Sequence, residues 1–287
     1  MPGNAVGAIT GGNSTDLTPA QLQALEAQFG LNRPVFSQWW LHLTQLFQGN
    51  LGRSFISGEP VSALLAANIP STAALTGLAL LLALVFGGGL ALWATHSRTG
   101  WTRSLLLSLP PLGVAVPTFW IGLMLLQFFS FDLRLFPGTG NEGFGSLVLP
   151  AITLAVPPGA FIASLLARSL EGAMAAPYAD TARGKGASEA RVQFRHALRN
   201  ALISTITIAG VLFGQLLAGA VVVETVFSRA GLGQLTNTAI TNSDIPIVQG
   251  MVVLGTVVFV AVNLIVDLIY PLLDPRIVLT GRSWAVA

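Results

Sequence analysis

Charged side chains are scarce in this sequence of 287 residues, of which Asp, Glu, Lys and Arg make up only 9%. A soluble domain carries about a quarter charged residues, because its surface must be compatible with water. Here 53% of the residues are hydrophobic and the mean hydropathy is +0.71. Most of the chain therefore requires lipid as its solvent, and the sequence predicts an integral membrane protein.

Cysteine is absent, and the single lysine is Lys185. The lack of cysteine excludes a disulfide framework, thiolate metal sites and thiol nucleophiles. A nucleotide-binding P-loop needs Lys followed by Ser or Thr to hold phosphates and Mg²⁺, but Gly186 follows Lys185. His42, His96 and His196 stand apart from one another, without the spacing of zinc ligands. We therefore expect no catalytic residue, no metal site and no cofactor in this chain.

Five runs of the sequence contain no Asp, Glu, Lys or Arg. Each is long enough to cross a hydrocarbon core, which takes roughly 20 helical residues. Backbone groups in lipid need internal partners and the runs are too long for barrel strands, so the predicted fold class is all-α. Helix disturbers such as 87–89, Pro117 and 157–158 fit either close packing of small residues or kinked helices that line a pathway. The predicted transmembrane helices cover 71–95, 105–130, 147–170, 201–225 and 248–272.

Basic residues are concentrated on one side of these spans. The loops 96–103 and 168–200 and the tail after residue 272 hold ten of the fourteen, and the positive-inside rule places them in the cytoplasm. The basic composition thus reflects topology, and we expect no nucleic-acid partner. Residues 1–70 would then lie outside, although no apolar helix precedes them, so we expect an upstream first helix to be missing from this sequence. The predicted division is an extracytoplasmic segment 1–70, a transmembrane domain 71–275 and a cytoplasmic tail 276–287.

The segment 172–200 is a polar, basic insert between two apolar runs. Pro177 suits the first turn of a helix, which we expect over 178–183, and Gly186 would end it. Ser188 is the predicted N-cap of a second helix. Such an element either anchors the topology through lipid phosphates or contacts a soluble partner. The second helix would carry a basic stripe of Arg191, Arg195 and Arg199.

The order Asp180-Thr181-Ala182, followed after three residues by Gly186, resembles the Glu-Ala-Ala…Gly loop of binding-protein-dependent ABC importer permeases. Asp180 and Thr181 depart from that pattern, but 181–186 and 195–200 are similar to the dipeptide and oligopeptide permeases. The resemblance implies that the first short helix docks into a groove of an ATPase subunit and transmits its closure. The coupling residues that it implies are Tyr178, Asp180, Thr181, Ala182, Arg183, Lys185 and Gly186.

Three further motifs extend the resemblance along the chain. Residues 49–54 resemble a Gly-Asp-Leu-Gly-x-Ser segment, with Asn in place of Asp, and 223–233 resemble a Val-Glu-Thr-Val-Phe…Gly-Leu-Gly segment. Residues 263–276 are similar to the C-terminal signature of the first, B-type permease subunit. The resemblance implies a type I ABC importer transmembrane fold, with six helices of which five are visible here.

The function that the resemblance implies is that of a permease subunit of an ATP-driven importer for peptides or a similar small solute. Its partners would be a homologous second permease, two cytoplasmic ATP-binding subunits, an extracytoplasmic solute-binding protein and the lipid of a prokaryotic inner membrane. Peptides, nickel chelates and glutathione all remain open as cargo. The alternatives are a secondary transporter coupled through intramembrane carboxylates, and a membrane scaffold or sensor. The candidate structural or pathway-lining residues are Gln127, Gln215, Glu224 and Asp267.

Overall fold

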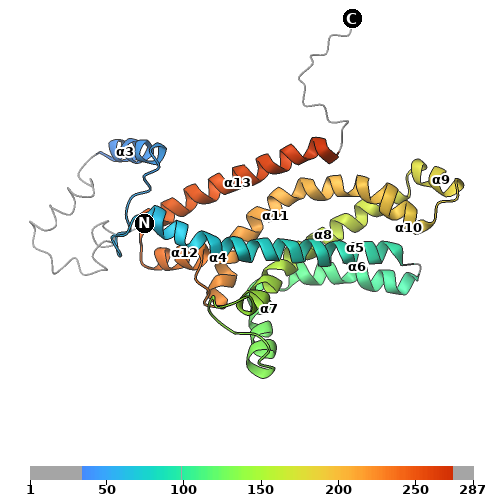
Figure 1. Ribbon diagram of the computed structural model, residues 1–287, viewed down its shortest axis with the longest axis horizontal. Coiled ribbons are helices and arrows are strands. Elements are labelled where there is room, and N and C mark those ends of the chain that lie inside the picture. Colours follow the sequence, from blue (N-terminus) through green and yellow to red (C-terminus); the bar gives the residue numbers. More distant parts are fainter. Residues whose placement is uncertain (1–33, 98, 274–287) are drawn as a thin grey trace, which may run out of the picture.

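The computed structural model describes residues 34–97 and 99–273, and its regular elements in these ranges are all helices (Figure 1). This confirms the predicted all-α class. The predicted cytoplasmic tail 276–287 and the first part of the predicted segment 1–70 lie outside the described residues. Most helices run side by side along the long axis of the molecule, and the short helix α9 lies at one end of that axis (Figure 1).

The elements follow one another in a simple order, with three π-helical segments, named η, inside or beside the longer helices. They are α3 (Val35–Phe47), α4 (Val61–Leu82), η2 (Ala83–Gly87), α5 (Gly88–His96), α6 (Gly100–Ala115), α7 (Thr118–Leu125), η3 (Leu126–Asp132), α8 (Gly145–Met174), α9 (Pro177–Gly184), α10 (Glu189–Arg191), η4 (Val192–Ala197), α11 (Leu198–Val226), α12 (Leu232–Thr241) and α13 (Ile245–Leu273).

Within residues 34–97 and 99–273, three helices are long and apolar enough to cross a membrane on their own: Val61–His96, Gly145–Met174 and Ile245–Leu268. They contain the predicted spans 71–95 and 147–170 and most of 248–272. The predicted span 201–225 lies within α11, of which the part Val211–Val226 is an apolar helix by its described residues.

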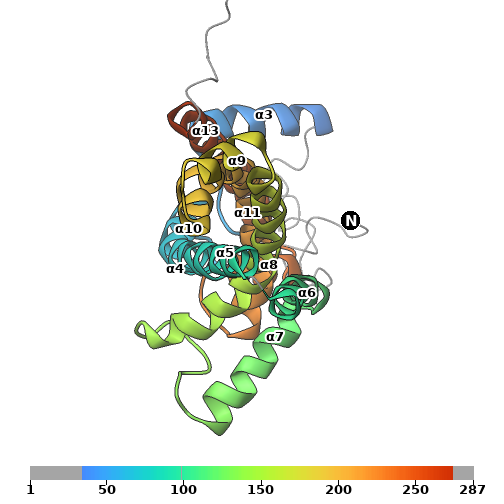
Figure 2. The ribbon, with the colours of Figure 1, turned by 90° about the vertical axis from the view of Figure 1, so that its right-hand side faces the viewer.

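The predicted span 105–130 is not one continuous helix. Neither α6 nor the following α7–η3 is long enough to cross a membrane alone. Together they are long and apolar enough, but the chain bends by 101° between them. Pro117 explains the break, because proline lacks an N–H and forces the residue before it out of the helical region. Val116 accordingly has extended dihedral angles, φ −81° and ψ 128°. α7 therefore projects away from the other helices (Figure 2). Counting this bent pair as one span, four helices can cross by length and composition.

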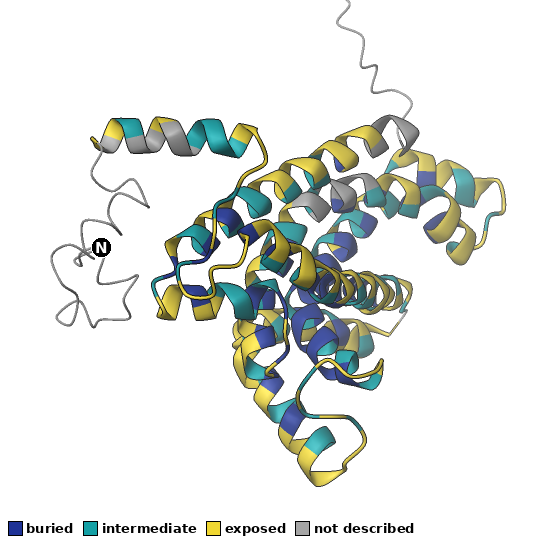
Figure 3. Cartoon of the chain, turned by 60° about the vertical axis from the view of Figure 1, so that its left-hand side comes forward, coloured by how far each residue is buried: buried dark blue, intermediate teal, exposed yellow. Residues whose placement is uncertain are grey.

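α8 is the central helix of the bundle, since it packs against α4, α5, α6, α7 and α11, and Figure 3 shows that the buried residues gather in the middle of the molecule. Its Leu149 and Leu154 belong to a buried cluster that also contains Leu75 of α4 and Leu212 and Leu216 of α11. In a membrane such a cluster is held by close van der Waals packing. The hydrophobic effect adds little there, because the side chains would otherwise contact lipid tails that are equally apolar. By contrast, the most apolar 18-residue stretch of α13 contains no residue that is buried within the described part of the chain. α8 and α11 thus form the centre of the bundle. α9 follows the end of α8, and Glu224 lies near the end of α11.

Candidate functional site

The segment between α8 and α11 is a compact helical element rather than an open loop. α8 continues to Met174, and after α9 the helical path through α10, η4 and α11 runs without a break from Glu189 to Val226. The predicted polar segment 172–200 therefore contributes two short non-helical turns, 175–176 between α8 and α9 and 185–188 between α9 and α10. Pro177 occupies the first turn of α9, as predicted, and Asp180 lies in that same turn, where a carboxylate favours the helix N-terminus.

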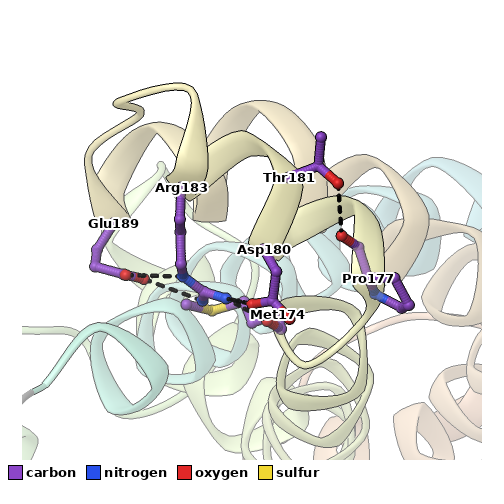
Figure 4. Close-up of polar contacts among 6 residues, drawn as sticks. All are labelled: Met174, Pro177, Asp180, Thr181, Arg183 and Glu189. Carbon is purple, nitrogen blue, oxygen red and sulfur yellow. Dashed lines mark hydrogen bonds and ion pairs between the residues drawn. The ribbon is translucent and has the colours of Figure 1, made fainter.

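Arg183 joins the three helices that meet in this element (Figure 4). Its Nη1 donates to the carbonyl oxygen of Met174 at 3.1 Å and to Oδ1 of Asp180 at 2.8 Å. Its Nε and Nη2 donate to the two carboxylate oxygens of Glu189 at 2.9 and 3.3 Å. This bidentate pair adds directional specificity to charge attraction. The hydrogen bonds to Glu189 and then to Asp180 raise the pKa of Arg183, so the side chain stays charged at every physiological pH.

The turn after α9 depends on Gly186, whose φ of +84° lies in the left-handed region. The N–H of Gly186 donates to the carbonyl of Arg183 at 2.9 Å, and the N–H of Ala187 donates to that of Ala182 at 3.1 Å. This pair of bonds is the Schellman arrangement, which satisfies the last carbonyls of a helix. Ser188 then caps α10, as predicted, by accepting from the N–H of Arg191 at 3.4 Å. The two ends are thus closed locally and the turn is held in one shape.

The face that α9 presents outward contains most of the candidate coupling residues. Ala179 is fully buried, whereas Tyr178 is 39% exposed. Thr181 and Lys185 are also exposed, and the hydroxyl of Thr181 is used within the helix, where it donates to the carbonyl of Pro177 at 3.0 Å. Arg183 is half-buried and holds the element together, whereas Asp180 bonds to Arg183 and is itself exposed on the outward face. Tyr178, Asp180, Thr181 and Lys185 are thus the side chains positioned to meet another protein.

Gln193 is a functional candidate that the sequence reasoning missed. Its side chain is fully buried in η4, and its Nε2 donates to the carbonyl of Leu92 and to the hydroxyl of Thr95, both at 2.9 Å. Its Oε1 lies 2.8 Å from Nδ1 of His96. Gln193 thereby joins the start of the α10–α11 helix to the end of α5. The one signal in the sequence is its position two residues from Arg191, which places it on the face opposite the basic stripe.

At the other end of the bundle, Glu224 of α11 lies fully buried at the N-terminus of α12. Its Oε1 accepts from the hydroxyl of Thr72 in α4 at 2.6 Å. Its Oε2 accepts from the backbone N–H groups of Gly233 at 2.7 Å and Gln234 at 3.2 Å. A carboxylate is well placed there, because the free N–H groups of a helix N-terminus carry partial positive charge.

The Gly-Leu-Gly motif leaves room for this carboxylate. A Cβ on Gly231 would lie 2.2 Å from Oε1 of Glu224, and one on Gly233 would lie 2.5 Å from the Cα of Val221. Larger residues at either position would displace α12 from α11. The spacing from Glu224 to Gly233 is therefore explained by one packed corner, which we call the α11–α12 corner.

Arg229 and Asn141 extend this corner towards α8. Arg229 is 5% exposed, and its Nη1 donates to the carbonyl of Gly140 and to Ser146 over 3.3–3.4 Å. Burial lowers the pKa of Arg229, and the charge of Glu224 opposes that effect. Asn141 donates to Ser71 and exchanges two hydrogen bonds with the backbone of Ala230. The corner thus binds α4, α11 and α12 to the segment before α8.

Within the described part of the chain, the other candidate pathway residues are not hydrogen-bonded to one another. Gln127 is exposed and donates to Asp132 of its own segment at 3.0 Å. Gln215 is exposed on α11, and Asp267 is exposed near the end of α13. Among the described residues, no hydrogen bond joins any two of these three. They lie on three different elements, η3, α11 and α13.

A cavity of about 400 Å³ lies between η2, α6 and α8. Its walls are apolar and include Phe86, Leu109, Pro110 and Val156. A peptide or other polar solute needs hydrogen-bond partners when it leaves water. The cavity offers no such side chains, so it does not account for recognition of a polar solute.

Comparison with known proteins places these features in a wider group. Residues 83–279 match the family described as binding-protein-dependent transport system inner membrane component. A glutathione transport system permease protein of Salmonella paratyphi A is 36% identical over 282 residues, which cover 96% of this chain and 90% of that protein. A Brucella abortus permease named for a peptide transport system is 35% identical over 285 residues, with the same two coverages of 96% and 90%.

Solved structures share the fold. An inward-facing structure of the MetNI methionine ABC transporter aligns with a TM-score of 0.64 at 16% identity, over 74% of this chain and 96% of that chain. An amino acid ABC transporter aligns with a TM-score of 0.57 at 16% identity, over 73% of this chain and 94% of that chain. At this identity the likeness concerns the arrangement of the helices, and it agrees with the predicted transmembrane fold of type I ABC importers.

Proposed function

The chain belongs to the family of binding-protein-dependent transport system inner membrane components, and we propose that within it this permease forms half of a pathway that imports small peptides. It is a membrane-embedded permease subunit of an ABC importer, and its homologues are permeases named for glutathione and peptide transport. Glutathione is itself a small peptide, so the two names share one solute chemistry. The alternative of a secondary transporter coupled through Asp267 has no support from these relatives.

One observation carries the proposed mechanism: the exposed helix α9 is held by Arg183 to the end of α8 and to α10. We infer that α9 is the coupling helix and that its exposed Tyr178, Thr181 and Lys185 meet a cytoplasmic ATP-binding subunit. A helix clamped in this way moves with its neighbours rather than folding away from them. Closure of the ATPase would then move α8 and α11 together, and Gln193 would carry the movement to α5.

The complete transporter in this proposal has a second homologous permease, two ATP-binding subunits and a solute-binding protein on the outer side. α9 and the C-terminus lie on the cytoplasmic side, and the α11–α12 corner lies at the extracytoplasmic mouth. ATP-driven closure at α9 biases a bundle with two stable arrangements, which alternately opens to either side. The corner bonds keep α4, α11 and α12 moving as one body during this exchange.

The proposal is tested in proteoliposomes that contain the assembled transporter with its ATPases and binding protein. We expect ATP-dependent uptake of labelled dipeptides or glutathione. Lys185→Glu should reduce uptake and weaken ATPase association while leaving membrane insertion intact, because it reverses an exposed charge on the coupling face. Arg134→Glu is the matched control, since Arg134 is exposed and lies between η3 and α8, away from α9. Unchanged uptake and unchanged ATPase association in Lys185→Glu would contradict the role of α9.

A further inference from the structure

Helix α3, Val35–Phe47, contains no Asp, Glu, Lys or Arg and lies before the residues 83–279 that match the family. Phe36, Trp40, Leu43 and Phe47 follow one another at intervals of four, three and four residues, which places them along one face of the helix. Three of these side chains are prominently exposed: Phe36 at 74%, Trp40 at 56% and Phe47 at 85%. Gln45 lies on the opposite face. We call the four apolar residues the aromatic stripe.

The linker after α3 is fixed to the ends of two membrane helices. The hydroxyl of Ser54 donates to Oδ2 of Asp244, and the N–H of Phe55 donates to Oδ1 of the same carboxylate at 3.2 Å. Asp244 is 2% exposed and directly precedes α13. The carbonyl of Gly52 accepts from the N–H of Val61, the first residue of α4, at 3.0 Å. The linker therefore holds α3 at the level where α4 and α13 begin, opposite the end that carries α9.

The direction of α3 differs from that of the spans. In Figure 1 the spans run along the long axis and α3 is foreshortened, whereas Figure 2 shows α3 at greater length across the bundle. α3 thus runs mainly across the spans, which is the direction of the membrane plane. It lies to one side of the bundle rather than among its helices (Figure 3).

The surface beside α3 is already a membrane surface. α13 exposes apolar side chains along its length, among them Val252 at 64%, Val257 at 60% and Leu264 at 57%. Its first residue follows Asp244, to which the linker of α3 is bonded. The apolar exterior of α13 and the aromatic stripe are therefore two apolar surfaces on segments that the Ser54–Asp244 hydrogen bond ties together. Lipid suits the aromatic stripe better than a soluble protein would, because α3 offers no charged group for specific pairing.

We propose that α3 is an interfacial helix, which lies on the membrane at the mouth of the permease and buries its aromatic stripe at the boundary between headgroups and acyl chains. Aromatic side chains favour this boundary, and an amphipathic helix lies in it with its apolar face towards the acyl chains. Through Ser54 and Asp244, the bilayer then holds the entrance of α13 in place. That the leaflet is the outer one rests on the proposed function.

The absence of cysteine makes the depth of this helix measurable, because any introduced cysteine is unique in the chain. Phe36→Cys, Phe47→Cys and the matched control Gln45→Cys carry nitroxide labels in the assembled transporter in phosphatidylcholine nanodiscs. Collision rates with oxygen and with a water-soluble nickel chelate report depth. We expect the two stripe labels at roughly 5–10 Å below the headgroups, and the Gln45→Cys label in contact with water.

A second variant tests the cause. Phe47→Asp, combined with Phe36→Cys, should lift the label towards water, because a carboxylate is costly in the apolar layer. Gln45→Asp should leave the depth of the same label unchanged. Equal access of the nickel chelate to all three labels would overturn the proposal. So would a stripe that becomes protected from water only after the solute-binding protein is added, which would make α3 a protein-docking helix.

The leaflet is tested separately from the depth. An impermeant thiol reagent added to sealed proteoliposomes should distinguish Gln45→Cys from Lys185→Cys, which lie at opposite ends of the bundle in the proposed topology. Labelling of both from the same side would contradict the proposed topology of the transporter while the depth profile still held. If the stripe labels stay in water while uptake still proceeds, the interfacial helix is contradicted and the proposed function is not.

Discussion

Gly87 in η2 and Gly159 in α8 cross so closely that a Cβ on Gly87 would lie 2.3 Å from the carbonyl oxygen of Gly159. Neither backbone can move aside without disturbing its own helix, so the crossing requires glycine at position 87. Of the two explanations for the 87–89 glycines, close packing therefore applies to Gly87. The neighbouring Gly89 has no atom within 4 Å of a Cβ position and carries no such constraint.

Gly87→Ala should therefore destabilise the bundle, whereas Gly89→Ala should not. Overpacking of a close contact costs typically ~1–3 kcal/mol, and here the clash is with backbone. The measurement is the thermal unfolding midpoint of the purified subunit or complex in detergent. Equal midpoints for the two variants would show that η2 and α8 do not cross as closely as described.

Gln193→Leu should weaken the link between η4 and α5. Leucine fills similar space but leaves the carbonyl of Leu92 and the side chains of Thr95 and His96 without their partner. These groups are half-buried or exposed, and Thr95 keeps its bonds to the carbonyls of Ala91 and Leu92, so the cost is that of the lost hydrogen bonds themselves, ~0.5–1.5 kcal/mol each. Faster backbone hydrogen exchange at the start of the α10–α11 helix should report the loosened contact, together with less uptake per ATP hydrolysed.

The matched control is Gln215→Leu, because Gln215 is exposed and has no hydrogen bond to another helix among the described residues. Both substitutions add the same side chain, so they share any general effect of hydrophobicity. If exchange at the start of α10–α11 were the same in the two variants, Gln193 would not be the link that the structure indicates.

Glu224→Gln should loosen α12 from α11. The amide has one acceptor oxygen where the carboxylate has two, so a backbone N–H at Gly233 or Gln234, or the hydroxyl of Thr72, loses its acceptor. Burying such an unpaired group costs ~1–3 kcal/mol, and the favourable charge at the N-terminus of α12 is lost as well. Thermal unfolding in nanodiscs measures the effect. Glu59→Gln is the control, since Glu59 is exposed, and a similar loss there would point to charge alone.

Much of the fold follows from solvent compatibility, and less of it from local sequence. Charge-free runs mark the spans because an unpaired charge in lipid is costly, and that rule acts on each run separately. The bend between α6 and α7 follows from Pro117 locally, but its 101° angle depends on what α7 packs against. The α9 cap was also readable, because Gly186 and Ser188 act on residues within one turn.

The long-range contacts were not readable in the same way. Gln193 meets Leu92 across 101 residues, and Glu224 meets Thr72 across 152 residues. Nothing in the sequence around one residue of such a pair identifies the other. Gln193, in a polar segment, was therefore missed, and Glu224 could be noted only as a carboxylate at the end of an apolar run. Arg183 shows the limit differently: the sequence predicts it as a coupling residue, but not the four hydrogen bonds by which it also joins α8, α9 and α10.

Replacing Gly184, at the end of α9, and Gly186, in the turn after it, by alanine should change the stability in opposite directions. Gly186 has φ +84°, and a Cβ there meets no atom within 4 Å, so the cost of Gly186→Ala is backbone strain alone, ~1–2 kcal/mol. Gly184 ends α9 with helical geometry and equally open space, so Gly184→Ala should stabilise α9 by ~0.5–1 kcal/mol. If the shape of the turn transmits force, Gly186→Ala should lower uptake per ATP and Gly184→Ala should preserve it. The ratio of the two rates, measured in the same proteoliposomes, decides the matter, because a loop that acts only as a flexible tether would tolerate both substitutions alike.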